Sequence, residues 1–554
     1  MARRSRTRSR RRARADGSRA IFGRAERETA GGGRSHAACY LLRPVNAPEP
    51  EPTAEDLVRR AEAALAFLEE ANADRGVLYH LGEELRRRLL EAAGRLSRPD
   101  PWKKREFFRE ARRARKEQLR DVDERQLASR GIRKLREEAV FPTPLTPAPV
   151  EPGADIDARL AEPARERAEV REARSCYICK AEFRELHFFY DSLCQSCGEL
   201  NYAKRTQSAD LRGRTAVVTG ARVKIGYQTS ILLLRAGCTV IATTRFPHDA
   251  ALRYAREADF ESWRERLQVH GLDLRHTPSV EAFAKHLDLS LPRLDFLINN
   301  ACQTVRRPAG FYAHLMEAER AELHSLPAGA QAILRSHESL RTSELPVALL
   351  GLGHHDAPEL SQRALLAEDL VRSEALFPGG QLDQDLQQID LRRHNTWRMP
   401  LAEVSTIELL EVQLVNAVAP FVLNARLKPL MLRVPTRDKH IVNVSAMEGQ
   451  FYRSFKTDKH PHTNMAKAAL NMMTRTSAQD YVRDGIHMNS VDTGWVTDED
   501  PAEIAARKTA EHGFHPPLDI VDGAARIVDP IFSGFATGTH VWGQFLKDYR
   551  SVAW

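Results

Sequence analysis

The stretch Thr215-Ala-Val-Val-Thr-Gly220-Ala-Arg-Val-Lys-Ile-Gly226 decides the fold of this chain. It joins a short apolar run to an apolar helical pattern over 225–234, through a turn that has a glycine at each end. In such a strand–turn–helix unit, the backbone N–H groups of the turn and the positive end of the helix dipole face a pyrophosphate. The sequence therefore predicts a dinucleotide site at this turn. The residues expected to line it are Gly220, Arg222, Lys224, Ile225 and Gly226.

From Leu211 to the C-terminus, short apolar strands alternate with helical patterns. This alternation predicts an α/β fold with a doubly wound parallel sheet. Three segments follow the turn in order: Gly271-Leu-Asp273-Leu274, Asn299-Asn-Ala301-Cys302, and Asn489-Ser-Val-Asp-Thr-Gly494-Trp-Val496-Thr497.

Together with the turn, these segments resemble the ordered motifs of the short-chain dehydrogenase/reductase family. The family's motifs are TGxxxGxG, a third-strand element that contacts the adenine, NNAG, and NxxxPG followed by a threonine. In this chain Lys224 replaces the middle glycine of TGxxxGxG. The resemblance covers about 211–301 and 401–543 and implies a Rossmann-type fold. It implies further cofactor contacts by Asp273, Leu274, Asn299 and Ala301, and by Gly494, Val496 and Thr497 on the nicotinamide side.

The end of the second predicted strand, 238–243, bears on the choice of dinucleotide. It runs into Thr244-Arg245, where an acidic residue would accept the ribose 2′-hydroxyl of NAD. A threonine and an arginine suit a 2′-phosphate instead, and Arg222 is a second partner for that charge. The sequence therefore favours NADP(H) as the cofactor.

The same resemblance implies a catalytic Tyr-x-x-x-Lys pair on one helix, with a serine after the fifth strand and an asparagine in the fourth helix. Asn416 and Lys467 match the asparagine and the lysine. The resemblance implies that Lys467 also binds the cofactor, at the nicotinamide ribose. Thr463 occupies the tyrosine position, and its hydroxyl is a far weaker acid than a phenol, whose pKa is about 10. The fifth strand ends in Ser445-Ala446, with alanine where the family's serine belongs.

A substitute proton donor is therefore expected near Thr463. A second Tyr-x-x-x-Lys string begins at Tyr452, in a predicted loop, and its tyrosine is the leading candidate. His460, His462 and a water held by Lys467 are the alternatives, since histidine titrates near pH 6.5. The expected catalytic residues are Asn416, Ser445, Tyr452, Thr463 and Lys467.

One large departure from the family pattern separates its two halves. Between Asn300 and Asn416 lie 115 residues, where family members have a short segment. We expect about 306–400 to form a mostly helical insertion, with a helix over 360–376. Because it leaves from the carboxyl end of the fourth strand, where ligands bind, we expect a lid or a partner surface. A structural addition without a role in substrate binding is the alternative.

Four cysteines form two pairs, Cys176-Tyr-Ile-Cys179 and Cys194-Gln-Ser-Cys197, separated by fourteen residues. Two such turns offer four thiolates that close a tetrahedron around Zn²⁺. We therefore expect a structural zinc module over 175–205, with a hairpin supplied by the aromatic segment between the pairs. Redox thiols are the alternative, and four protein ligands argue against a catalytic zinc.

Length and charge complete the expected organisation of the chain. The 554 residues carry a net charge of +8, and the eight arginines of residues 1–15 account for the whole excess. We expect a disordered Arg-rich leader over 1–50, a helical region over 51–140 and a linker over 141–174. The Rossmann domain is expected over 211–554. A cytoplasmic protein without a membrane span is expected, and the leader leaves nuclear or organellar import open.

These features favour an NADP(H)-dependent oxidoreductase acting on a carbonyl or alcohol, with an atypical proton donor. The alternative is an NADP(H)-binding pseudoenzyme with a regulatory or scaffold role. Nucleic-acid binding is the weakest hypothesis, because the charge outside the leader balances. The expected partner is a small-molecule substrate; a homo-oligomer, and a protein partner on the helical region or the insertion, stay open.

Overall fold

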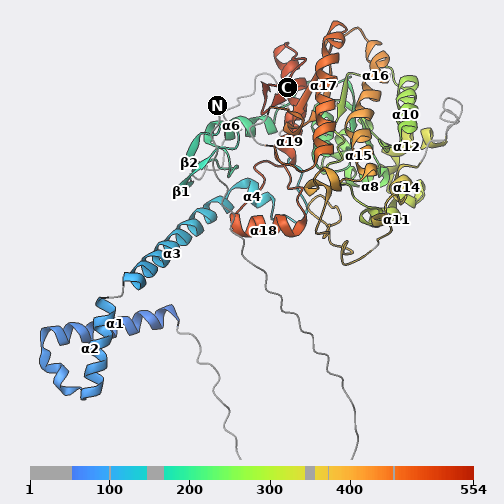
Figure 1. Cartoon of the computed structure of the whole chain (residues 1–554). Helices are drawn as coiled ribbons and strands as arrows, with labels where there is room; N and C mark the ends of the chain where they lie inside the picture. Colours follow the sequence, from blue (N-terminus) through green and yellow to red (C-terminus); the bar gives the residue numbers. More distant parts are fainter. Residues whose placement is uncertain (1–52, 99–100, 146–167, 343–355, 372, 453–455) are drawn as a thin grey trace, which may run out of the picture. The chain divides into compact units, whose positions relative to one another are not determined.

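The computed structural model describes residues 53–98, 101–145, 168–342, 356–371, 373–452 and 456–554 (Figure 1). The expected leader, 1–50, lies outside these ranges, as does most of the expected linker. The chain divides into two compact units, Met1–Glu106 and Phe107–Trp554.

The described part of the first unit is helical. It contains α1 (Ala54–Ala73), the 3₁₀ turn η1 (Arg75–His80) and α2 (Glu83–Ser97). Thr53 is the N-cap of α1, and its hydroxyl accepts the N–H of Asp56 at 3.2 Å.

A small cysteine-bearing module follows helices α3 (Pro101–Ala128) and α4 (Gly131–Leu135). It contains β1 (Ala168–Ser175), β2 (Glu182–Leu186) and α6 (Gln195–Arg205). The linker was expected to reach 174 and the hairpin to lie between the cysteine pairs. Instead, β1 begins at Ala168 and pairs antiparallel with β2, so that the first cysteine pair lies in the connection of the hairpin.

An eight-stranded sheet forms the centre of the second unit, in the order β10-β9-β8-β7-β6-β3-β4-β5. Every neighbouring pair is parallel except β9 with β10. The strands are β3 (Thr215–Thr219), β4 (Thr239–Thr244), β5 (Leu267–Gly271), β6 (Phe296–Asn299), β7 (Lys439–Ser445), β8 (Ile486–Asp492), β9 (Phe545–Lys547) and β10 (Arg550–Val552). The strand order confirms the predicted Rossmann-type α/β fold.

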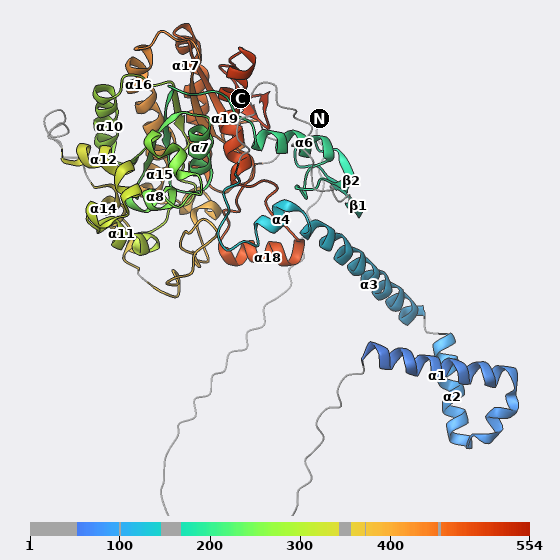
Figure 2. The same ribbon diagram turned by 180° about the vertical axis from the view of Figure 1, so that it is seen from behind.

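Helices cover both faces of this sheet, as the opposite views of Figures 1 and 2 show. One core joins the sheet to α7 (Lys224–Arg235), α8 (Pro247–Tyr254) and α19 (Ile520–Thr537). The other joins it to α10 (Thr277–Ser290), α16 (Ala419–Leu432) and α17 (Pro461–Arg483). The segment Thr406–Leu432 is long and apolar enough to cross a membrane by length and composition, but here its second half packs into this core.

The insertion differs from its prediction. Its longest described helix, α12 (Ala328–Thr342), packs on β5 and α8 at the edge of the sheet. The helix predicted over 360–376 is wrong: α14 (Ala357–Ser361) is short and is followed by the 3₁₀ turn η5 (Ala367–Leu370). The Asp369 carboxylate accepts the N–H groups of Leu365 and Leu366, and such side-chain bonds compete with helix formation.

The remaining elements are short, apart from α15 and α18. They are α9 (Phe260–Trp263), η2 (Arg264–Arg266), η3 (Ala309–Leu315), α11 (Met316–Arg320), η4 (Leu323–Ser325), η6 (Thr396–Arg398), η7 (Leu401–Glu403), α15 (Thr406–Gln413), the π-helical turn η8 (Leu414–Val418), η9 (Met447–Gly449) and α18 (Ala502–His512).

Candidate functional site

A cavity of about 1370 Å³ lies at the carboxyl ends of the parallel strands. Its walls come from the β3–α7 turn, the segments after β4 to β8, and the second half of the insertion. Thirteen of the expected cofactor residues line it: Gly220, Arg222, Lys224, Ile225, Gly226, Arg245, Asp273, Leu274, Ala301, Lys467, Gly494, Val496 and Thr497. Sequence segments far apart in the chain thus meet at the edge where this class of sheet binds ligands.

The glycine-rich turn is tightly enclosed. A Cβ at Gly220 would lie 2.8 Å from the Ala301 Cα, and one at Gly226 would lie 2.3 Å from the Gly220 carbonyl oxygen. Gly220 has φ +66°, and Lys224, which replaces the family's middle glycine, has φ +57°. A lysine in this left-handed region is strained, so the chain keeps the conformation of the turn without the usual residue.

Asn299, expected at the cofactor, lies below the cavity instead. Its amide donates to the side-chain oxygens of Asn424 (2.9 Å) and Asn443 (2.8 Å), and all three residues are buried. The neighbouring Asn300 lines the cavity and donates to the carbonyls of Thr219 and Gly220. Successive side chains of a strand point to opposite faces of the sheet. At the end of β6, Asn300 therefore lines the cavity while Asn299 bonds buried asparagines.

At the expected adenosine end, Arg245 lies against an aromatic residue of the insertion. Its guanidinium donates to the hydroxyl of Tyr312 (2.5 Å) and lies 4.5 Å from the centre of that ring. Burial acts to raise the pKa of Tyr312, but the charge and hydrogen bond of Arg245 outweigh it and lower that pKa below the ordinary phenol value. Arg222, by contrast, already pairs with Asp249 at 2.7 Å.

At the nicotinamide end, Ser445, Thr463 and Lys467 all line the cavity. The Lys467 ammonium donates to the carbonyl of Val444 at 2.8 Å. The buried hydroxyls of Ser445 and Thr463 have no hydrogen-bond partner among the described residues. The site therefore offers one cation and two unpaired hydroxyls to a ligand.

Asn416 is not among the residues that line this cavity. It lies in the π-helical turn η8, and its side chain bonds both the N–H (2.8 Å) and the carbonyl (3.0 Å) of Gln303. It therefore fixes the segment after β6, whose residues Cys302 and Gln303 do line the cavity.

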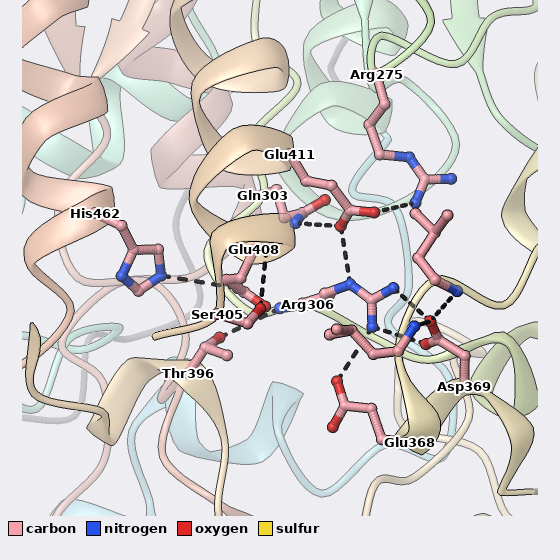
Figure 3. A network of polar contacts seen from close by, with 12 residues as sticks. Arg275, Gln303, Arg306, Glu368, Asp369, Thr396, Ser405, Glu408, Glu411 and His462 are labelled. Carbon is pink, nitrogen blue, oxygen red and sulfur yellow. Dashed lines mark hydrogen bonds and ion pairs between the residues drawn. The ribbon is translucent and has the colours of Figure 1, made fainter. Parts of the chain in front are cut away.

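Tyr452, the leading candidate for the proton donor, lies outside the cavity walls in the structure. Its side chain is 98% exposed. His462 is buried, faces Glu408 at 3.7 Å (Figure 3) and is not among the residues that line the cavity. His460 does line the cavity and stacks on Trp397, with ring centres 3.8 Å apart. A sequence string alone cannot tell which way a loop residue points, so the role of Tyr452 stays a prediction.

Arg306 joins the insertion to the Rossmann core through a network of polar contacts (Figure 3). The buried guanidinium binds both oxygens of Asp369 at 2.7 Å and one oxygen of Glu411 at 3.1 Å. Glu411 in turn binds Arg275 and the side chain of Gln303. The start of the insertion, its 3₁₀ turn η5, and helix α15 thus share one buried charge network.

The four expected cysteines do meet. Their sulfur atoms all lie within 4.8 Å of one another, and the Cys179 and Cys194 sulfurs are 3.7 Å apart. In a tetrahedral site with Zn–S bonds of 2.3 Å, the sulfurs are about 3.8 Å apart. The described cysteines are all free thiols, so the geometry fits a metal better than a disulfide pair.

Two tyrosines that line the cavity were missed from the sequence. Tyr177 lies inside the first cysteine pair, whose spacing drew attention only to the sulfurs, and Tyr312 lies in an insertion without a family pattern. Tyr177 and Tyr312 are the tyrosines that line the cavity among the residues described.

Comparisons with known proteins agree with this architecture. The family model described as short chain dehydrogenase matches residues 214–320, and the one described as enoyl-(acyl carrier protein) reductase matches 380–516. An uncharacterized protein, R665, of Acanthamoeba polyphaga mimivirus is 32% identical over 386 residues, covering 68% of this chain and 74% of that protein. Dehydrogenase/reductase SDR family member 13 of Bos taurus is 41% identical over 104 residues, covering 18% of this chain and 27% of the relative.

Solved structures resemble the chain more distantly. The RhlG protein of Pseudomonas aeruginosa, solved with NADP, is 17% identical with a TM-score of 0.39, covering 61% of this chain and 95% of its own. A short chain dehydrogenase of Burkholderia cenocepacia, solved with NADP, is 16% identical with a TM-score of 0.38, covering 61% and 97%.

The parallel sheet with a glycine-rich turn at its carboxyl edge defines a Rossmann-type α/β protein. Over residues 214–320 and 380–516, the chain is similar to the short chain dehydrogenase and enoyl-(acyl carrier protein) reductase families, respectively. The matched family segments leave 321–379 unmatched, a range that lies inside the insertion.

Proposed function

We propose that the chain is an NADP(H)-dependent oxidoreductase that interconverts a small carbonyl compound and its alcohol. The observation that carries this proposal is the single cavity that joins the glycine-rich turn, Arg245 and Lys467. Bound NADPH would supply a hydride to the carbonyl carbon while a proton reaches the carbonyl oxygen. Turnover of NADPH by the full chain with a panel of aldehydes and ketones tests this activity.

The preference for NADP(H) rests on Arg245. Its guanidinium bonds the hydroxyl of Tyr312, which brings a cation and a phenol together at the expected 2′-phosphate position. Arginine with a hydroxyl donor is a suitable pair for a phosphate dianion.

The Arg245→Ala variant should lose this preference. We expect NADPH affinity to fall roughly ten- to hundredfold, because a charge-assisted bond contributes about 1.5–3 kcal/mol, while NADH affinity stays nearly constant. Titration of both cofactors by fluorescence measures the ratio. Arg264→Ala removes an exposed arginine outside the cavity and serves as the control. Equal losses for the two cofactors would contradict the assignment.

The proton needs a donor other than the family's tyrosine, because Thr463 occupies that position. Burial lowers the pKa of His460 to about 4, so this ring is neutral at pH 7 and offers a hydrogen bond rather than a proton. The Lys467 ammonium and a water held by it and by the Thr463 hydroxyl are then the groups suited to deliver the proton. In this scheme Ser445 and His460 position the substrate oxygen.

A cofactor-binding protein without turnover is the second candidate. Ala446 and Thr463 favour it, because both standard hydroxyls of the family are replaced. NADPH binding at micromolar concentration without turnover of any carbonyl or alcohol would establish this second function.

We also propose a structural zinc ion held by Cys176, Cys179, Cys194 and Cys197. The four clustered thiols are the donor set of closed zinc sites, and no fifth ligand position is needed.

Purified full chain should contain about one zinc per molecule, and Cys194→Ser should lose it. Elemental analysis measures the metal, and proteolysis should then cut within 168–205, since the metal crosslinks both ends of the module. Cys302→Ser, an exposed cysteine outside the cluster, should keep the metal. Undamaged protein without metal would remove zinc from the proposal.

A further inference from the structure

Tyr177, the second residue of the first cysteine pair, reaches from the module to the cofactor cavity. Its hydroxyl accepts the backbone N–H of Trp495 at 3.0 Å. Both residues also line a second cavity, of about 520 Å³, so the pair forms part of the wall between the two cavities. A cysteine-module side chain therefore bonds the loop that follows β8, the nicotinamide side of the proposed site.

The loop 494–497 is held by backbone, side-chain and ring contacts. The Trp495 carbonyl accepts the N–H of Leu518 at 3.3 Å, and the Trp495 ring lies 4.7 Å from that of Phe514. Gly494 adopts φ +80°, and its N–H donates to the Asp492 carboxylate at 2.6 Å. The next N–H, that of Trp495, has the Tyr177 hydroxyl as its partner. Two consecutive amides at the nicotinamide end are thus fixed by side chains, one from the sheet and one from the module.

Apolar packing joins the same parts. Cys176 is fully buried in a cluster with Val496 and Leu518, and Tyr177 and Ile225 pack against that cluster. Val496 belongs to the loop and Ile225 to α7. Cys176 and Tyr177 therefore share one apolar cluster with the loop 494–497 and with the start of the helix that follows the glycine-rich turn.

The module is itself fixed to the Rossmann domain by buried polar bonds. The Tyr190 hydroxyl donates to Asp522 at 2.5 Å, and Arg205 pairs with Asp519 at 2.6 Å and with Asp522 at 3.0 Å. Both carboxylates lie at the start of α19. Tyr177 therefore belongs to a module that buried polar bonds attach to the Rossmann domain, and it bonds the loop 494–497 from there.

We infer that Tyr177 is a positioning residue for the nicotinamide half of the cofactor, and that the cysteine module sets the conformation of the loop 494–497 through it. This inference rests on the proposed NADP(H) and zinc assignments. It gives the module a role in cofactor binding in addition to stabilising its own fold.

The test compares NADPH with adenosine 2′,5′-bisphosphate, which has the adenosine half of NADP and lacks the nicotinamide. In the Tyr177→Phe full chain, NADPH should bind roughly three- to tenfold more weakly, the usual effect of one lost hydrogen bond. Affinity for the bisphosphate should stay within twofold. Tyr202→Phe, a ring-preserving change on α6 within the module, should leave both affinities unchanged.

Equal weakening of both ligands, or an unchanged NADPH affinity, would overturn the inference, because a general loss of structure affects both halves alike. A wild-type chain that binds neither ligand would overturn the proposed function, and this inference with it.

Hydrogen exchange of the wild-type chain provides a test that needs no variant. Removal of zinc by a chelator should speed amide exchange in 494–497 at least tenfold and leave strand β6 unchanged. Zinc loss with unchanged exchange in this loop would contradict the coupling.

Discussion

Replacing Arg306 with methionine should lower the free energy of unfolding of the Rossmann domain by about 3–5 kcal/mol. The side chain is 4% exposed and is the shared partner of Asp369 and Glu411. Burial acts to lower the pKa of Arg306, but its bonds to Asp369 and the charge of Glu411 outweigh this and raise it above the usual value. In the variant, the buried carboxylates of Asp369 and Glu411 each lose the Arg306 guanidinium as a positive partner. Urea unfolding followed by tryptophan fluorescence measures the loss.

Arg320→Met is the matched control, because Arg320 forms an exposed pair with Glu359 at 2.8 Å and should change stability by less than about 1 kcal/mol. Adding Asp369→Asn to Arg306→Met should recover part of the loss, since the buried charge is then removed. A loss below about 1 kcal/mol in the single variant would show that the insertion does not depend on this network.

The dinucleotide turn and its surroundings could be predicted from the sequence because they obey local rules. β-branched residues before Gly220 form a buried strand, and the apolar pattern after Gly226 forms the helix. The order of the later segments then placed Arg245 and Gly494 at the same edge of the sheet, since parallel strands bring their carboxyl ends together.

The insertion and the module could not be predicted to the same extent, because distant contacts decide their structure. The segment of β1 is rich in Glu and Arg and was expected to be a linker, yet it becomes a strand by pairing with β2. The sequence after Leu360 has a helical pattern, but it does not form the predicted helix. Asp369 in this segment instead bonds Arg306, a partner 63 residues away. The contact between Tyr312 and Arg245 likewise joins residues that lie far apart in the sequence.

The Lys467→Ala variant should lower turnover by about 10²–10⁴, because it removes the cation beside the reacting oxygen and the group that holds the proton-carrying water. It should also weaken NADPH binding, since in the proposed complex the ammonium exchanges its bond to the Val444 carbonyl for the nicotinamide ribose. Steady-state kinetics with the best carbonyl substrate measures the first effect, and titration measures the second. Unchanged affinity for adenosine 2′,5′-bisphosphate shows that the variant is folded.

Tyr452→Phe is the informative comparison, because the family's Tyr-x-x-x-Lys string made this tyrosine the leading proton donor. Its phenol lies in water and away from the cavity, so its loss should change turnover less than twofold. Thr463→Val should lower turnover if the water between this hydroxyl and Lys467 carries the proton. A large effect of Tyr452→Phe with a silent Lys467→Ala would instead mean that the loop after Gly449 folds over the bound cofactor and restores a phenol to the site.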